Sequence, residues 1–238
     1  MRADRVAGNA GRGQAVPLLV TVKVDVWSDV ACPWCYIGKR RFEAAAAAFE
    51  GEVEIEYHAY ELAPDAPEEF EGSHEDYLVG RGFPREQIDA MDTRVASLAE
   101  GVGLHYDYAR NRPTRTLRAH ELIRFAKEHG KQAEMKDRLM SAYFERGEHV
   151  GRIEELARIA GELGLDPDDA RAALESGRYR QEVEQDIAQA AAYGIRGVPF
   201  FVLDGKYGVS GAQETVTFLQ VLRDVSAESS GDSESMEA

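Results

Sequence analysis

Two cysteines separated by two residues, Cys32 and Cys35, are the only cysteines in this chain of 238 residues. They follow a valine-rich run at residues 20–27 and precede a helical pattern at residues 36–49. A strand that delivers a C-x-x-C to the start of a helix is the arrangement of a thiol–disulfide active site. The positive end of the helix dipole favours a thiolate at Cys32, and a thiolate is the nucleophile in disulfide exchange. We therefore expect Cys32 to be solvent-accessible and Cys35 to be buried.

Two other uses of a cysteine pair fit the sequence less well. A structural zinc site usually takes four Cys or His ligands in two spaced pairs. This chain has no second cysteine pair, and its six histidines contain no H-x3-5-H pair. A purely structural disulfide is also disfavoured, because a gap of two residues closes too small a loop to remove much entropy from the unfolded chain. The spacing favours a redox pair without a metal.

A second motif lies far downstream, where Val198 and Pro199 precede the apolar run Phe-Phe-Val-Leu at residues 200–203. The run is typical of a short buried strand, and Asp204-Gly205 after it indicates a turn. Taken alone, Pro199 reads as an ordinary trans residue at the start of a strand, since only about 5–6% of X–Pro bonds in folded proteins are cis.

Together the two motifs resemble those of thioredoxin-fold oxidoreductases, and specifically the FrnE-like subgroup of the DsbA-like family. The resemblance runs from about residue 20 to residue 225, in the family's order. Its matching segments are residues 28–39, 61–64, 119–122, 197–202 and 210–213. The chain departs from the family pattern at Arg115, where the family has an asparagine.

The resemblance implies an α/β thioredoxin-like fold with a large all-helical insertion. It also implies a cis peptide bond between Val198 and Pro199 beside the cysteines, with the backbone of Val198 offered to an extended substrate. Pro33 and Trp34, which separate the cysteines, are expected to contact substrate and to influence the redox poise.

The resulting plan divides the chain into four parts. Residues 18–62 and 195–225 form the thioredoxin-like domain, and residues 63–194 form the helical insertion. Residues 1–17 are expected to be a flexible extension, and the Ser/Glu/Asp-rich residues 226–238 a disordered tail. Periodicity and turn signals predict strands at 18–27, 53–57, 200–203 and 207–210. They predict helices at 36–49, 85–99, 117–129, 131–146, 152–163, 167–176, 179–193 and 213–225.

Charge and hydropathy exclude several classes of function. The net charge of −15 argues against nucleic acid as a partner, because a nucleic-acid groove needs a basic stripe. No run approaches the roughly 20 apolar residues of a transmembrane helix, and the N-terminal segment does not fit a secretory signal. A cytoplasmic location follows, in which thiols are kept reduced and a C-x-x-C is more often catalytic than structural.

Other polar residues near the motifs are given mainly structural roles. Asp29 is expected to cap the helix that follows the cysteines. His120 is either a packed, hydrogen-bonded histidine or a contact near the active site. The basic residues 39–41 read as a solvated helix face, with a direct effect on the cysteines as the alternative. His58 and Glu61 are expected to be structural.

These observations predict a dithiol–disulfide oxidoreductase or isomerase. Cys32 attacks a protein or small-molecule disulfide, and Cys35 resolves the mixed disulfide or receives electrons from a cellular thiol reductant. No bound cofactor is expected beyond the redox-active disulfide Cys32–Cys35, although glutathione could be a co-substrate. The sequence leaves a monomer and a homodimer open.

Two other classes of function remain as alternatives. One is a glutathione-dependent isomerase of a small aromatic substrate, similar to the 2-hydroxychromene-2-carboxylate isomerases that share the fold. Cys35 argues against it, because thiol addition and elimination need no resolving partner. The other is a binding module without enzymatic activity, which leaves an oxidation-prone cysteine pair unexplained.

Overall fold

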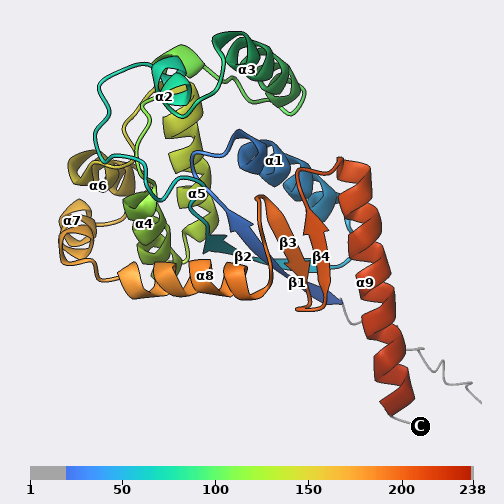
Figure 1. Ribbon diagram of the computed structural model, residues 1–238. Helices are drawn as coiled ribbons and strands as arrows, with labels where there is room; N and C mark the ends of the chain where they lie inside the picture. Colours follow the sequence, from blue (N-terminus) through green and yellow to red (C-terminus); the bar gives the residue numbers. More distant parts are fainter. Residues whose placement is uncertain (1–19, 237–238) are drawn as a thin grey trace, which may run out of the picture.

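A four-stranded mixed sheet forms the centre of the molecule in the computed structural model, which describes residues 20–236 (Figure 1). The strand order is β2-β1-β3-β4. Strand β1 (Thr21–Ser28) is parallel to β2 (Glu52–Ala59) and antiparallel to β3 (Phe200–Leu203), which pairs with antiparallel β4 (Tyr207–Ser210). The two central strands thus come from opposite ends of the chain.

Helices α1 (Pro33–Ala48) and α9 (Thr215–Met236) cover one face of the sheet and pack against each other (Figure 1). The Phe42 ring stacks on Phe201 with centroids 5.0 Å apart and meets Phe218 edge-on at 5.2 Å. Alternate residues of β1 point into this layer, as the period of two in the valine run requires. They are Val22, Val24 and Val26.

Helix α8 (Arg180–Ala192) lies on the opposite face, where Trp27 packs with Ala190 and Val202. The remaining α-helices lie beside the sheet, with the first two along the chain at the top of the view in Figure 1. They are α2 (His74–Gly80), α3 (Arg85–Glu100), α4 (Leu117–Glu128), α5 (Gln132–Ser141), α6 (Ile153–Glu162) and α7 (Pro167–Ser176). The largest apolar core joins most of these helices to the start of α1, because Cys32, Cys35 and Tyr36 belong to the same cluster as residues of α3 to α7.

Several predicted elements lie at the predicted residues, including β3, β4 and α7. The start of α7 shows why its signal was strong. The Asp166 carboxylate accepts a hydrogen bond from the backbone N–H of Asp168 at 2.9 Å, and Pro167 occupies the first helical position. Gly177 ends the helix with a φ of 62°, a left-handed conformation that glycine adopts without steric cost.

Other boundaries differ from the predicted ones. Helix α1 begins at Pro33, three residues before the predicted start, because a proline is well tolerated where no N–H donor is needed. Helix α2 was not predicted, since it is short and lies in an acidic segment without apolar periodicity; a capping box between Ser73 and Asp76 starts it. The helix predicted at 131–146 is α5 followed by a π-helical turn, Ala142–Arg146.

The prediction of a disordered tail from residue 226 is wrong for residues 226–236, because α9 continues to Met236. The Ser229 hydroxyl donates to Asp204 Oδ2 at 3.2 Å, and the Tyr207 hydroxyl donates to Glu228. These contacts with the turn and edge strand β4 were not visible in the composition. The predicted extension at residues 1–17, like residues 237–238, lies outside the described residues.

No helix in the described part of the chain is long and apolar enough to cross a lipid bilayer.

Candidate functional site

The cysteine pair lies at the N-terminus of α1. Cys32 is the N-cap residue, Pro33 and Trp34 follow as the first helical residues, and the backbone N–H of Cys35 donates to the Cys32 carbonyl at 3.0 Å. Both thiols are free in this structure. The Cys32 side chain therefore lies where unpaired backbone N–H groups and the helix dipole favour negative charge.

The segment before β3 reaches the same point. The Cys32 thiol donates to the Val198 carbonyl at 3.6 Å, and the Val198–Pro199 peptide bond is cis. Gly38 makes this approach of α1 sterically feasible, because a Cβ atom there would lie 2.9 Å from Pro199 Cγ. Four of the predicted site residues, Cys32, Cys35, Val198 and Pro199, are thus brought together, with Pro33 and the partly exposed Trp34 between the cysteines.

Cys35 is buried as predicted, but the prediction that Cys32 is solvent-accessible is wrong for this structure. Cys32 is only 3% exposed and Cys35 only 2%. The loop after α3 contributes to the cover: the Tyr106 hydroxyl donates to the Pro33 carbonyl at 2.8 Å, and Tyr106 packs on the core that contains both cysteines. The sequence showed no sign of this cover, since Tyr106 lies more than 70 residues from the cysteines. Any molecule that reacts with the Cys32 sulfur has to displace part of this cover.

Asp29 does not cap α1, contrary to prediction. Its carboxylate accepts from the Leu62 N–H at 2.8 Å and the Ala31 N–H at 3.4 Å, and lies 3.3 Å from His120 Nε2. Burial raises the pKa of Asp29, but the hydrogen bond and charge of His120 and the Leu62 N–H outweigh it, so the pKa lies below its usual value. His120 combines both predicted alternatives, because it is packed and 2% exposed and also contacts the loop before Cys32.

Lys136 was missed by the sequence analysis. It is 1% exposed, and its ammonium group donates to the Ser28 carbonyl at 3.1 Å. Burial lowers the pKa of Lys136 to about 8, although the charges of Cys35 and Asp29 act in the opposite direction. A signal was available: helical spacing puts Lys136 on the buried face of α5, in line with Leu139 and Met140.

Burial also dominates the chemistry of Cys35. It raises the pKa of the Cys35 thiol well above the usual value, and a hydrogen bond and charge at Cys32 raise it further. The positive charge of Lys136 and the backbone of Asp29 lower it in part. Cys35 is therefore a poor thiolate former unless a nearby charge assists it.

The three basic residues of α1 form ion pairs. Lys39 is buried and pairs with Glu43 at 2.5 Å and Asp137 at 3.1 Å. Arg40 pairs with Asp137 at 3.0 Å, while Arg41 donates to the Ala212 carbonyl at 2.8 Å and pairs with Glu214. These side chains connect α1 to α5 and to the segment just before α9 rather than forming a solvated face.

A second polar cluster lies around His58, on the β2 side of the sheet. His58 Nε2 is 2.7 Å from Asp25 Oδ1, and Nδ1 is 2.9 Å from Asp186 Oδ1. Asp25, Glu56 and His58 could in principle ligate a metal, since their ligand atoms lie within 4.8 Å of one another. However, both His58 nitrogens already have partners, and Arg124 neutralises Glu56 at 3.3 Å. This cluster is an ion-pair network that joins the sheet to α4 and α8.

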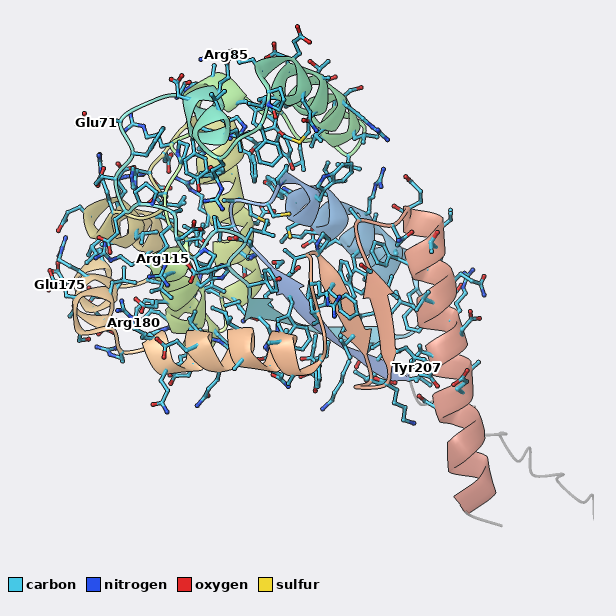
Figure 2. All side chains as sticks on the ribbon, viewed as in Figure 1. Glu71, Arg85, Arg115, Glu175, Arg180 and Tyr207 are labelled. Carbon is cyan, nitrogen blue, oxygen red and sulfur yellow. The ribbon has the colours of Figure 1, made fainter. Side chains whose placement is uncertain are left out.

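Arg115, the position at which the chain departs from the family pattern, forms a bidentate pair with Glu61 at 3.1 and 2.9 Å. Figure 2 shows Arg115 and Arg180 on the same side of the molecule, and the two line one small pocket of about 40 Å³. The guanidinium of Arg180 pairs with the fully buried Glu121. Arg115 is thus engaged in a salt bridge, as is Glu61, for which a structural role was predicted.

A larger pocket of about 300 Å³ lies beside the loop that precedes Cys32. Ala31 and Leu62 line it from the sheet side, and Tyr77 and Phe83 line it from the segment around α2. The His74 ring also lines it; Nε2 lies 3.4 Å from Asp92 Oδ2, and Nδ1 has no hydrogen-bond partner within the described residues. The pocket is mainly apolar, with a few polar groups at its wall.

A family model of the DsbA-like thioredoxin domain matches residues 23–223, which include both cysteines and all of the sheet except the first two residues of β1. The chain belongs to the DsbA-like thioredoxin family. The family and fold predicted from the sequence are confirmed, while the FrnE-like subgroup stays a prediction.

Individual proteins are also similar to this DsbA-like chain in sequence or in fold. It is 30% identical over 207 residues to the uncharacterized protein YwbO of Bacillus subtilis strain 168, a match that covers 86% of this chain and 98% of YwbO. It is 37% identical to a probable DsbA oxidoreductase from Streptomyces coelicolor, with a TM-score of 0.80 and coverage of 85% and 89%. A 2-hydroxychromene-2-carboxylate isomerase has the same fold at 16% identity, with a TM-score of 0.64 and coverage of 91% and 100%.

Proposed function

We propose that the protein is a thiol–disulfide oxidoreductase or isomerase whose reactive centre is Cys32-Pro33-Trp34-Cys35. The observation that carries the proposal is the meeting of Cys32 with Val198 at the N-terminus of α1. A helix N-terminus favours the thiolate that disulfide exchange requires. Similarity to the probable DsbA oxidoreductase of Streptomyces coelicolor supports the same class of reaction.

In the proposed reaction, the Cys32 thiolate attacks a substrate disulfide and forms a mixed disulfide, releasing the other substrate sulfur as a thiol. Cys35 then attacks Cys32, releases the second substrate thiol and leaves the Cys32–Cys35 disulfide. A cellular thiol reductant, with glutathione as one candidate, restores the dithiol. The protein would act in the cytoplasm on protein or small-molecule disulfides, as a member of the FrnE-like subgroup.

Val198 and Pro199 would hold the substrate. The backbone of Val198, whose carbonyl is next to the Cys32 thiol, would pair with an extended segment on either side of the substrate cysteine. Trp34 is 36% exposed at the surface beside the pair, so its ring and Pro33 would contact the same segment.

Single substitutions of the two cysteines test the proposal. We expect Cys32→Ser to abolish insulin reduction, whereas Cys35→Ser should accumulate mixed disulfides that nonreducing gels and mass spectrometry detect. The two variants control for each other, because each removes one buried sulfur and circular dichroism reports whether the fold survives. Wild-type turnover by Cys32→Ser would place the reactive centre elsewhere.

The pocket of about 300 Å³ beside Ala31 favours one second candidate, a glutathione-dependent isomerase of a small aromatic substrate. Apolar walls with a few polar groups are typical of small-molecule sites. In that case Cys35→Ala should keep full activity on the aromatic substrate, and that activity should depend strictly on glutathione. Loss of multiple-turnover disulfide reduction in Cys35→Ala, with no such isomerase activity, supports the redox function instead.

A further inference from the structure

Lys136 differs from the other buried lysine near the site. Lys39 is 5% exposed and has two carboxylate partners, Glu43 and Asp137. Lys136 is 1% exposed, and its ammonium group donates to the Ser28 carbonyl at 3.1 Å. The next backbone N–H, that of Asp29 in the same peptide unit, is a hydrogen-bond partner of the Cys35 sulfur, so one peptide unit contacts both side chains. Among the residues that the structure describes, no carboxylate forms an ion pair with Lys136. Its position in the core is therefore costly for stability.

Packing alone does not explain a lysine at this position. A buried charge without a well-placed partner costs several kcal/mol, and apolar residues of similar volume often replace buried charges with no loss of stability. The neighbours of Lys136 on α5, Met135 and Leu139, are fully buried apolar residues, so methionine would suit the same environment. Strongly perturbed buried groups beside a reactive centre are candidates for a functional role.

Charged and titratable groups surround Lys136 on several sides, from α1, α4, α8 and the sheet. Most of them already have a hydrogen-bond or ion-pair partner. Asp29 interacts with His120 and two backbone N–H groups, and Asp186 interacts with His58 and Arg124. The set is Cys32 at the N-cap of α1, Cys35 and Lys39 on α1, Asp29 after β1, Tyr57 and His58 on β2, His120 and Arg124 on α4, and Asp186 on α8. Cys35 is the member of this set that needs a positive charge in order to react.

We propose that the buried ammonium group of Lys136 supplies the positive charge that lets Cys35 react as a thiolate. Lys136 is then a positioning residue, which acts on the resolving step through Cys35. This inference rests on the proposed oxidoreductase function. The buried position strengthens the effect, because a charge acts more strongly where water does not screen it.

The assisted step balances without any further reactant. Cys35 releases its thiol proton, and its sulfur forms a bond to Cys32 Sγ as the bond from Cys32 Sγ to the substrate sulfur breaks. The departing substrate thiolate takes up a proton in exchange. The enzyme pair is oxidised by two electrons, and the substrate disulfide is reduced by the same two. In the reverse direction, Lys136 stabilises Cys35 as the leaving thiolate.

A single-turnover reaction separates the two cysteines. Reduced protein is mixed with one equivalent of 5,5′-dithiobis(2-nitrobenzoate), and the release of thionitrobenzoate is followed by stopped-flow absorbance. The first equivalent reports attack by Cys32, and the second reports attack by Cys35. We expect Lys136→Met to slow the second phase about tenfold or more near neutral pH, the effect of one unit in the pKa of Cys35, and to leave the first phase within about twofold.

The variants include conservative and matched controls. Lys136→Arg keeps the charge and should retain most of the second-phase rate, while Lys136→Gln provides a second neutral side chain if Lys136→Met does not fold. Lys127→Met removes a lysine from the surface of α4, where it pairs with Glu56, and should leave both phases unchanged. A second phase with the same rate and pH dependence in the wild type and both neutral variants overturns the inference.

A single-cysteine background distinguishes failure of this inference from failure of the proposed function. In Cys32→Ser, the ultraviolet absorbance of the thiolate follows the titration of Cys35 directly. Adding Lys136→Met should shift this titration to higher pH; no shift would refute the role of Lys136. If the wild type releases no second equivalent at all, the proposed function fails, but the titration still decides whether Lys136 acts on Cys35.

Discussion

Burial shifts the pKa values of Cys35 and Lys136, near the N-terminus of α1, in opposite directions. It makes the Cys35 thiol harder to ionise and the Lys136 amine easier to neutralise. Each charge would relieve the cost of the other, so the thiolate–ammonium pair is less unfavourable than either charge alone. The same reasoning applies to Asp29, which keeps a lowered pKa despite burial because His120 and the Leu62 N–H stabilise its charge.

The pKa of Lys136 gives a prediction about stability. It falls from about 10.5 in the unfolded chain to about 8 in the folded protein. Between these values the unfolded chain binds the additional proton, so this residue makes stability rise with pH across that window. Below about pH 8, Lys136→Met should be more stable than the wild type by roughly 3 kcal/mol, because each unit of the pKa shift corresponds to about 1.4 kcal/mol. The excess should shrink as the pH rises to 10.5.

Urea unfolding of both proteins at several pH values measures this difference. Groups common to both proteins largely cancel in the comparison. A difference in unfolding free energy that stays constant from neutral pH to pH 10.5 would contradict the prediction.

At the scale of elements, the site depends on how closely α1 approaches the segment before β3. The contact point is Gly38, one turn after Cys35, where an added Cβ atom would lie 2.9 Å from Pro199 Cγ and 3.3 Å from Ala212 Cβ. Neither neighbour is the free end of a flexible side chain. A helix side chain at this position would therefore push α1 away from Val198 and from the substrate backbone it is proposed to bind.

We expect Gly38→Ala to destabilise the protein by about 1–3 kcal/mol, the usual cost of overpacking a tight contact. Activity in insulin reduction should fall as well, because Cys32 would move relative to Val198. Gly80→Ala is the matched control: Gly80 ends α2, and an added Cβ atom there meets nothing within 4 Å. That substitution should be neutral or stabilising by up to about 1 kcal/mol. Equal effects of both substitutions in thermal unfolding would contradict the role given to Gly38.

Across the whole molecule, the helical insertion and the thioredoxin-like part share one core. Val30, Cys32 and Cys35 belong to the same apolar cluster as residues of α3 to α7. The ion-pair network around His58 joins the sheet to α4 and α8 at a second place. The division into a thioredoxin-like part and a helical insertion therefore holds along the chain. The two parts do not have independent hydrophobic cores.

We therefore expect a single cooperative unfolding transition in urea. Both tryptophans, Trp27 and Trp34, lie in the thioredoxin-like part, so fluorescence reports that part. Far-ultraviolet circular dichroism reports mainly the helices, most of which belong to the insertion. Coincident midpoints for the two signals are the expected result; two separated transitions would show that the insertion unfolds alone.

The sequence was informative where function depends on short, local patterns. The cysteine spacing, the valine run and the apolar strand at residues 200–203 predicted the central strands of the sheet and the position of the cysteine pair at a helix start. It was less informative where distant elements meet. The cover over Cys32 depends on Tyr106, and the charge near Cys35 depends on Lys136, and neither is adjacent to the cysteines in the chain. The tail was misread because composition does not report contacts such as that between Ser229 and Asp204.

The position of β3 between β1 and β4 has a consequence during synthesis on the ribosome. Cys32 and the Val198 carbonyl that it contacts are 166 residues apart. At about 5–20 residues per second, roughly 10 to 30 s pass between their translation. Until the end of that interval the thiols lack the segment at Val198, and for the first part of it they also lack Tyr106 and most of the helical insertion. A nascent chain would therefore expose its cysteine pair to cellular oxidants. The ribosome-bound stage would be the stage at which Cys32 or Cys35 most easily forms a disulfide with another molecule.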